Sequence, residues 1–167
     1  VSPGFHARHH SSAAVDRIFD NDTEQFSVMS YFDESKYEGA SPGGNPTPQM
    51  ADILAVQSLY GPAVTRPGDT IYGRAGNAGA VIDSVGFGLP GLTPPASFTI
   101  VDSGGTDLID VSHVDVVQRL VLTPGTWSSV GGGIKNLGIG SATTIENART
   151  GGGADDLVGN AVDNGLD

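Results

Sequence analysis

Three short segments of this 167-residue chain place oxygen-bearing groups in tight turns. Arg66-Pro-Gly-Asp-Thr70 offers backbone carbonyls and a threonine hydroxyl, and Asp102-Ser-Gly-Gly-Thr-Asp107 sets two carboxylates around a Gly-Gly bend. Thr144-Ile-Glu146 puts two oxygen-bearing side chains on one face of an expected strand, because side chains alternate along a strand. Glycine lets backbone oxygens approach a hard cation closely, and Ca²⁺ prefers oxygen ligands. The chemistry on offer is calcium binding, although each segment alone is more typical of an ordinary Gly/Asp turn.

Residues 150–167 repeat with a nine-residue period. Thr150-Gly-Gly-Gly-Ala-Asp-Asp-Leu-Val158 fits the pattern Gly-Gly-x-Gly-x-Asp-x-U-x, where U is a large apolar residue, except at its first glycine. A degraded second copy follows, with Asn164 in the place of Asp155. Nonapeptides of this type wind a parallel β-roll whose Gly-Asp turns bind Ca²⁺ between successive coils. The candidate ligands are Gly151, Gly153 and Asp155.

The composition favours cations as partners and excludes several others. The formal net charge is −11 and the pI about 4.4, which argues against nucleic acid or an anionic membrane surface. No cysteine is present, so disulfides and thiolate metal sites are excluded, and no stretch is apolar for long enough to span a membrane. The chain starts at Val1 without a methionine or a signal-peptide pattern and stops inside a repeat. We therefore expect a piece of a longer protein.

The elements that would position these groups are mostly short strands. Glycine and proline number 25 and 10, and only 16% of residues are charged, which indicates many turns. One helix is predicted, with Thr47 as N-cap, Pro48 as first residue and an end at Tyr60 before Gly61-Pro62. Its apolar stripe predicts an amphipathic helix packed on a core. The predicted strands are 70–72, 80–85, 97–101, 108–111, 119–123 and 143–146.

One further segment carries a family resemblance. Gln25-Phe-Ser-Val-Met-Ser-Tyr31 resembles the Met-turn of the metzincin zinc peptidases in its serralysin form, which ends in Met-Ser-Tyr. On residue types alone, a methionine beside a serine turn is as typical of core filler. The segment Asp52-Ile-Leu-Ala-Val-Gln-Ser-Leu-Tyr-Gly61 also resembles the helix that closes serralysin catalytic domains. The resemblance extends from about Asp20 to Asp167.

The resemblance implies roles for particular residues. Met29 would be the hydrophobic floor under a zinc site, and Tyr31 the catalytic side chain whose phenol reaches the metal or the transition-state oxyanion. It also implies two shared calcium sites. The first would be formed by Arg66, Gly68, Thr70, Asp102, Gly104 and Asp107, and the second by Gly105, Asp107, Thr144 and Glu146.

The histidines depart from the pattern of the family. A metzincin needs His-Glu-x-x-His-x-x-Gly-x-x-His, in which the glutamate is the general base, and the cluster His6-Ala-Arg-His9-His10 has neither this spacing nor the glutamate. In serralysins the third zinc ligand stands directly before a Pro-Gly pair, whereas Ser2 precedes Pro3-Gly4 here. The histidine ligands are thus absent, which leaves Tyr31 as the one zinc ligand of the family. Zinc binding by His9 and His10 remains an alternative, although a loop cluster of histidines is usually solvated.

The resemblance predicts a two-part chain. Residues 1–62 would be the end of an α+β metzincin catalytic domain, and 63–167 a calcium-binding parallel β-roll or β-sandwich domain with its first repeats at 150–167. The function implied is that of the C-terminal portion of a serralysin-like zinc metalloendopeptidase, secreted by a type I system and folded by calcium after export. The parent would bind zinc and act on protein substrates. We expect the fragment itself to be monomeric and inactive.

A different class of function stays open. The chain could be a calcium-dependent secretion or binding module, or a pseudo-peptidase, with no catalytic role. An upstream helix with His-Glu-x-x-His would indicate an enzyme, and its absence a scaffold.

Overall fold

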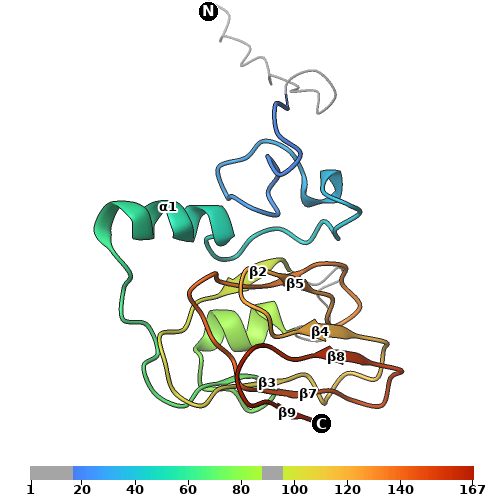
Figure 1. Cartoon of the computed structure of the whole chain (residues 1–167). Helices are drawn as coiled ribbons and strands as arrows, with labels where there is room; N and C mark the ends of the chain where they lie inside the picture. Colours follow the sequence, from blue (N-terminus) through green and yellow to red (C-terminus); the bar gives the residue numbers. More distant parts are fainter. Residues whose placement is uncertain (1–16, 88–95) are drawn as a thin grey trace, which may run out of the picture.

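The computed structural model describes residues 17–87 and 96–167 (Figure 1). Short strands dominate the part after residue 66, while the part before it consists of loops, a short 3₁₀-helix and one α-helix. The chain is therefore mainly β. No helix in the described ranges has the length and apolarity needed to cross a membrane.

The largest sheet has four parallel strands in the order β1-β3-β7-β9. They are β1 (Ile71–Gly73), β3 (Leu108–Asp110), β7 (Asn147–Arg149) and β9 (Gly165–Leu166). Ile71 pairs with Leu108, Leu108 with Asn147, and Asn147 with Gly165. The sequence separation between paired residues thus shortens to 18 residues (165 − 147), the length of two nonapeptides, where the repeats begin.

Two smaller sheets complete the strand region. The first has the order β2-β6-β5, and its strands are β2 (Phe98–Ile100), β6 (Leu137–Ile139) and β5 (Trp127–Ser128). The second pairs β4 (Arg119–Val121) in parallel with β8 (Asp156–Val158). Figure 1 shows the strands in layers, with β2 and β5 above, β4 and β8 in the middle, and β3, β7 and β9 below.

The core lies between these layers and is built from aligned apolar side chains. Tyr72, Ile109 and Ala148 pair across three neighbouring strands, and each is at most 1% exposed. The rings of Phe87 and Phe98 pack edge to face with 5.1 Å between their centres, an arrangement that aromatic pairs favour. The other large, fully buried apolar side chains are Ile100, Leu120, Leu122, Leu137, Ile139 and Ile145.

Four of the predicted strands are confirmed and two predictions are wrong. The strands expected at 70–72, 97–101, 108–111 and 119–123 correspond to β1, β2, β3 and β4. The segment 80–85 instead forms a π-helix, η2 (Val81–Gly86). Its turn is held by Asp83, whose carboxylate accepts hydrogen bonds from the amides of Gly79 (3.0 Å) and Gly73 (3.3 Å). The sequence prediction did not include β5 and β6.

The strand predicted at 143–146 is a loop, and β7 begins only at Asn147. The physical reason lies at Thr143, whose hydroxyl accepts a hydrogen bond from the amide of Asp102 at 3.0 Å. The alternation of exposure persists along this loop, because Ile145 is fully buried and Thr144 is exposed. Thr144 therefore does not lie on a strand face with Glu146.

The helix α1 (Met50–Tyr60) exists, but its surroundings differ from the prediction. It starts after Gln49, because the Asp52 carboxylate accepts the Gln49 amide at 2.8 Å, and it ends before Gly61, as expected. No residue of α1 is buried, and Leu59 is 75% exposed. The apolar residues of α1 are spread around the helix, so the predicted stripe on one face is wrong. The helix extends away from the sheets (Figure 1), so the predicted packing on a core is wrong.

Hydrogen bonds connect the loops before α1 to the strand region. The amide of Ile134 donates to the Ser41 hydroxyl at 2.9 Å, and the side chain of Gln25 donates to the carbonyl of Lys135. Gln49 donates to the carbonyl of Ser97 at 3.1 Å. The residues around the predicted Met-turn are thus anchored on the strands.

Candidate metal centre

Asp107 is the residue that connects the predicted calcium loops. Its side chain is fully buried, and Oδ1 accepts a hydrogen bond from the amide of Thr70 at 2.8 Å. Its own amide donates to Oε2 of Glu146 at 2.8 Å. Its second oxygen, Oδ2, is buried and has no hydrogen-bond partner among the described residues. A buried carboxylate oxygen without a donor is costly, and none of the described residues supplies a donor to this atom.

The first predicted site is brought together by two loops. Within the loop 66–70, the Thr70 hydroxyl donates to the carbonyl of Gly68 at 2.9 Å. Across the loops, Asp69 accepts the amide of Thr106 at 2.8 Å, and Asp102 accepts the amide of Gly104 at 2.9 Å. All of these loops lie at the same edge of the large sheet, before β1 and β3.

The side chain of Arg66 holds the first loop in place. Its guanidinium donates to the carbonyls of Ala78 and Val101, each at 3.0 Å, and stacks 5.9 Å from the ring centre of Tyr72. Of the groups of Arg66, only the carbonyl oxygen is of the type that Ca²⁺ binds, so the predicted ligand role would fall to it.

Two glycines let the loops approach each other. Gly104 and Gly105 have φ values of 149° and 130°, a region that residues with a side chain rarely adopt. A Cβ at Gly105 would lie 2.5 Å from the carbonyl carbon of Gly68. The Gly-Gly bend predicted from the sequence is therefore required by the packing of the loops.

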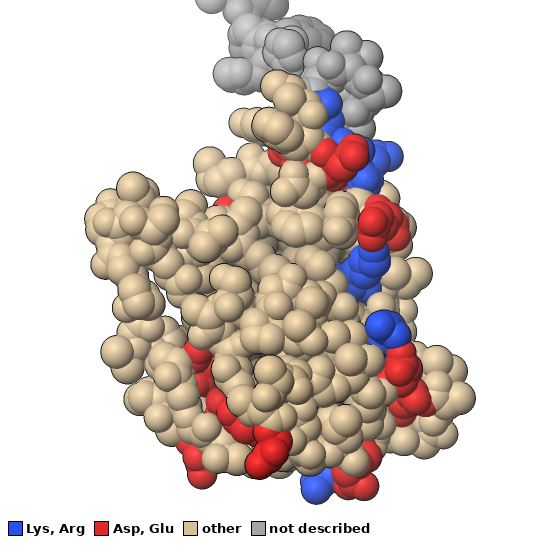
Figure 2. Space-filling view, viewed as in Figure 1, with Lys and Arg blue, Asp and Glu red and all other residues tan. Residues whose placement is uncertain are grey.

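The loops bring several carboxylates close together, and none of them forms an ion pair with a described residue. Burial, and then the charges of Asp102, Glu146 and Asp69, raise the pKa of Asp107 to about 6, against the lowering effect of the Thr70 amide. The phenol of Tyr72 donates to Asp102 at 2.5 Å, and burial followed by this contact raises its pKa. Four carboxylates of these loops form no ion pair with a described residue, namely those of Asp69, Asp102, Asp107 and Glu146. On the face drawn in Figure 2, acidic atoms at the lower left lie apart from basic ones, whereas acidic and basic atoms adjoin along the right side.

Part of the predicted second site is joined by a hydrogen bond. The amide of Asp107 donates to Glu146, and Gly105 lies on the same bend as Asp107. Thr144 is exposed and stands two residues before Glu146. The four-residue site stays a prediction.

The repeat residues Gly151, Gly153 and Asp155 form a separate turn beside the loop 112–118. Asp155 accepts the amide of Gln118 at 2.8 Å through Oδ1, while its Oδ2 is buried without a partner among the described residues. A Cβ at Gly151 would lie 2.1 Å from the carbonyl oxygen of Val114. This turn has the same features as the Asp107 loops, namely a close glycine approach and an unpartnered carboxylate oxygen.

Side chains alone do not make a metal site in the described ranges. No group of three or more His, Cys, Asp or Glu side chains there converges closely enough to hold an ion. A cation at Asp107 would therefore need carbonyl and hydroxyl oxygens, such as those of Gly68 and Thr70. Ca²⁺ accepts such mixed oxygen ligands, whereas zinc prefers nitrogen and sulfur. The donor set fits calcium and does not fit zinc.

The predicted Met-turn residues are exposed. Met29 and Tyr31 are 78% and 88% exposed, so neither is enclosed by the described residues. The turn itself is held by Asp52, which accepts the Ser27 hydroxyl at 2.6 Å and the Val28 amide at 3.0 Å. The histidines His6, His9 and His10 lie outside the described residues, so their alternative zinc site stays a prediction.

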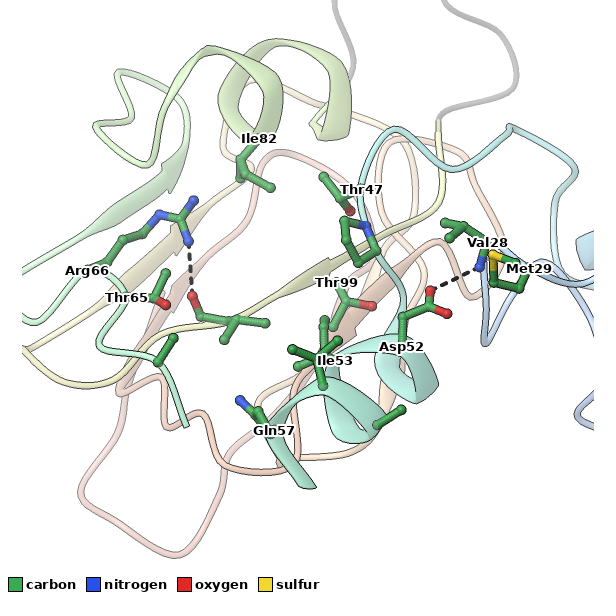
Figure 3. A pocket seen from close by; sticks show the side chains of 15 residues that line it. Val28, Met29, Thr47, Asp52, Ile53, Gln57, Thr65, Arg66, Ile82 and Thr99 are labelled. Carbon is green, nitrogen blue, oxygen red and sulfur yellow. Dashed lines mark hydrogen bonds between the residues drawn. The ribbon is translucent and has the colours of Figure 1, made fainter. Parts of the chain in front are cut away.

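An apolar cavity of about 660 Å³ separates α1 from the strand region (Figure 3). Met29 and Val28 line one end, Ile53 and Val56 contribute from α1, and Arg66 lies at the other end. The predicted Met-turn and the first predicted calcium loop therefore border the same cavity. Sequence reasoning missed Asp69, Tyr72 and Asp52, although the spacing of Gln49 and Asp52 is that of a capping box.

The chain belongs to the peptidase M10 serralysin C-terminal family, because the sequence model of that family matches residues 62–165. It is 39% identical over 153 residues to serralysin G of Dickeya chrysanthemi, covering 91% of this chain and 31% of that protein. It is 39% identical over 157 residues to metalloprotease AprA of Pseudomonas entomophila, covering 90% of this chain and 32% of the relative. With serralysin of Proteus mirabilis the identity is 40% over 150 residues, or 87% of this chain and 29% of the relative. The chain thus spans about a third of the length of these relatives.

Proposed function

We propose that this chain is the C-terminal portion of a secreted serralysin-like zinc metalloendopeptidase, and that its strand region binds Ca²⁺ in order to fold after export. The observation that carries the calcium proposal is the buried, unpartnered Oδ2 of Asp107, surrounded by uncompensated carboxylates. The family membership supports the protease parent. Calcium would be held by Asp107 and Asp102 together with the carbonyls of Arg66 and Gly68 and the Thr70 hydroxyl, and it would offset the charge of the loops.

The proposal places peptide hydrolysis in a longer protein only. The described residues do not form a zinc site, so no catalytic step is assigned to this chain by itself. The exposed position of Tyr31 leaves its hydroxyl free to contact a substrate in a longer protein. Protein substrates, type I secretion, a β-roll arrangement of the repeats and a monomeric state are parts of the same proposal.

Calorimetric calcium titration of the 167-residue chain tests the calcium role. We expect calcium uptake with a gain of strand signal in circular dichroism, and Asp107→Asn should abolish uptake at both shared sites. Glu38→Gln is the matched control, because it removes one exposed carboxylate that pairs with Lys135 outside these loops. A wild-type chain that is fully folded without calcium and takes up none would refute the proposal.

A non-catalytic calcium-dependent module is the second candidate, and the feature that favours it is that the 167 residues contain no His-Glu-x-x-His motif. Casein hydrolysis by the full-length protein separates the two. Chelator-sensitive cleavage supports the protease, whereas calcium binding without any cleavage supports the module.

A further inference from the structure

A second group of unpaired acidic side chains lies in the loops around residues 23–45, away from the calcium loops. Glu34 opens the 3₁₀-helix η1 (Glu34–Lys36) and is only 1% exposed. Its Oε1 has no hydrogen-bond partner among the described residues. A buried glutamate without an ion pair is rare in proteins, so this side chain calls for an explanation.

Three loop segments converge at Glu34. The amide of Glu24 donates to the carbonyl of Phe32 at 2.7 Å, which places the segment 23–24 beside 32–34. The side-chain amide of Asn45 donates to the carbonyl of Glu24 and so adds the third segment. One backbone hydrogen bond and one side-chain hydrogen bond therefore join the three segments.

The converging segments present several oxygens that lack donors. The hydroxyl of Thr23, Oε1 of Glu34 and Oδ1 of Asn45 are all buried and have no hydrogen-bond partner among the described residues. Thr23 is itself fully buried. Each such oxygen costs free energy when left unsatisfied, and the three residues lie on segments that hydrogen bonds join.

The acidic side chains around Glu34 are close to one another, since Glu24 and Asp33 both lie near enough to act on its carboxylate. No described lysine or arginine pairs with these acids. Asp33 is exposed and caps η1 through the Ser35 amide at 2.8 Å, so it remains outside the group.

We propose that Thr23, Glu24, Glu34 and Asn45 form a binding site for a hard divalent cation of the Ca²⁺ class, separate from the calcium loops of the strand region. Two carboxylates with hydroxyl and amide oxygens are ligands that Ca²⁺ accepts, and the ion would satisfy all of the unpartnered oxygens at once. A protonated Glu34 could donate to only one of them. The ion would hold together the segments that precede and follow the Met-turn.

Calcium titration in two backgrounds tests this site. In the 167-residue chain, Glu34→Gln should lower the calcium stoichiometry by one ion. In an Asp107→Asn background, which removes the shared sites of the strand region, Glu34→Gln should again remove one ion. Glu38→Gln, an exposed glutamate close by in the sequence, should change neither value. Because the two backgrounds separate the sites, this proposal can fail while the proposed function stands.

A second variant covers the case in which Glu34→Gln does not fold. Thr23→Val removes one ligand oxygen and keeps the shape of the side chain, and near-ultraviolet circular dichroism reports whether the fold is native. We expect the affinity of one calcium ion to weaken several-fold. An unchanged stoichiometry in Glu34→Gln, or an unchanged set of affinities in a folded Thr23→Val, overturns the site. A Glu34→Gln chain that is more stable without calcium and still binds every ion also overturns it, because that result indicates a neutral buried acid.

Discussion

The strand region and the loops before it differ in how they bury apolar surface. In the strand region, short strands enclose a continuous set of fully buried side chains such as Phe98, Ile109 and Ile139. In α1, by contrast, no residue is buried, although eight of its eleven residues are apolar. The two regions show that a strand stack closes its own core, whereas a single apolar helix needs a further surface. The predictions below probe this difference.

Truncation of the core should have the largest effect. Ile109→Ala removes a fully buried side chain between two sheet neighbours and should lower the free energy of unfolding by about 2–5 kcal/mol. Urea unfolding of the calcium-bound chain measures it. A loss below about 1 kcal/mol, the ordinary effect of a single substitution, would contradict a closed core at this position.

The pH dependence of the calcium-free chain should be the next largest effect. Burial raises the pKa of Asp107 from 3.8 to about 6, so the folded state keeps this proton where the unfolded state has lost it. The stabilisation is complete below about pH 4, and it is lost as the pH rises through about 6. Such a shift corresponds to about 2–3 kcal/mol. Calcium should reverse the slope, because the ion binds the ionised carboxylate.

Urea unfolding across this pH range checks the prediction, and Asp107→Asn is the control. The asparagine does not titrate, so the calcium-free variant should lose most of this slope. An unchanged slope in Asp107→Asn would assign the pH dependence to other groups.

Removal of the anchor of the Met-turn should have an intermediate effect. Asp52 accepts hydrogen bonds from Ser27, Val28 and Gln49, so Asp52→Ala should cost about 1–2 kcal/mol. Hydrogen exchange can localise the change. The Val28 amide should lose protection, while that of Ile109 should keep it. Equal loss at both amides would show that the two regions unfold as one.

The exposed helix should tolerate truncation. Leu59→Ala alters a side chain that is 75% exposed, so the free energy of unfolding of this chain should change by less than about 0.5 kcal/mol. The measurement is the same urea titration as for Ile109→Ala, which makes the pair a direct comparison. A cost near that of Ile109→Ala would show that α1 is packed against other residues in solution.

Tyr31→Phe should have the smallest effect on folding, because the ring remains and the hydroxyl is exposed. The melting temperature of this chain should be unchanged. In the longer peptidase proposed above, we expect kcat to fall more than KM rises, because the hydroxyl would act mainly in the transition state. An unchanged kcat would return Tyr31 to the role of a surface aromatic.

The elements that sequence reasoning predicted correctly are those with local signals. Gly61 ends α1, and alternating apolar residues mark β2 and β3, because both signals act within a few residues. The π-helix at Val81–Gly86 was missed, since it depends on contacts of Asp83 with the distant Gly73 amide. The exposure of α1 could not be predicted either, because apolar residues in a helix do not indicate whether another surface covers them.

In the candidate site, too, features with a local sequence signal were predicted and features that depend on tertiary contacts were not. The turn composition of the loop 102–107 predicted both carboxylates and the glycine bend, which the structure brings together with Thr70. The partners Asp69 and Tyr72 were missed, because their roles arise from packing between loops. The unpartnered oxygens of Thr23 and Glu34 had no signal in the sequence, since burial of a polar atom is a tertiary property.

A crystal structure grown with calcium, with anomalous diffraction, tests the central claim most directly. We predict an ion peak at the Ca²⁺–oxygen distance of about 2.3–2.6 Å from Oδ2 of Asp107, with carbonyl oxygens of the loop 66–70 completing the coordination. A water molecule or a protonated carboxyl at this position, with no anomalous peak in saturating calcium, would contradict the account.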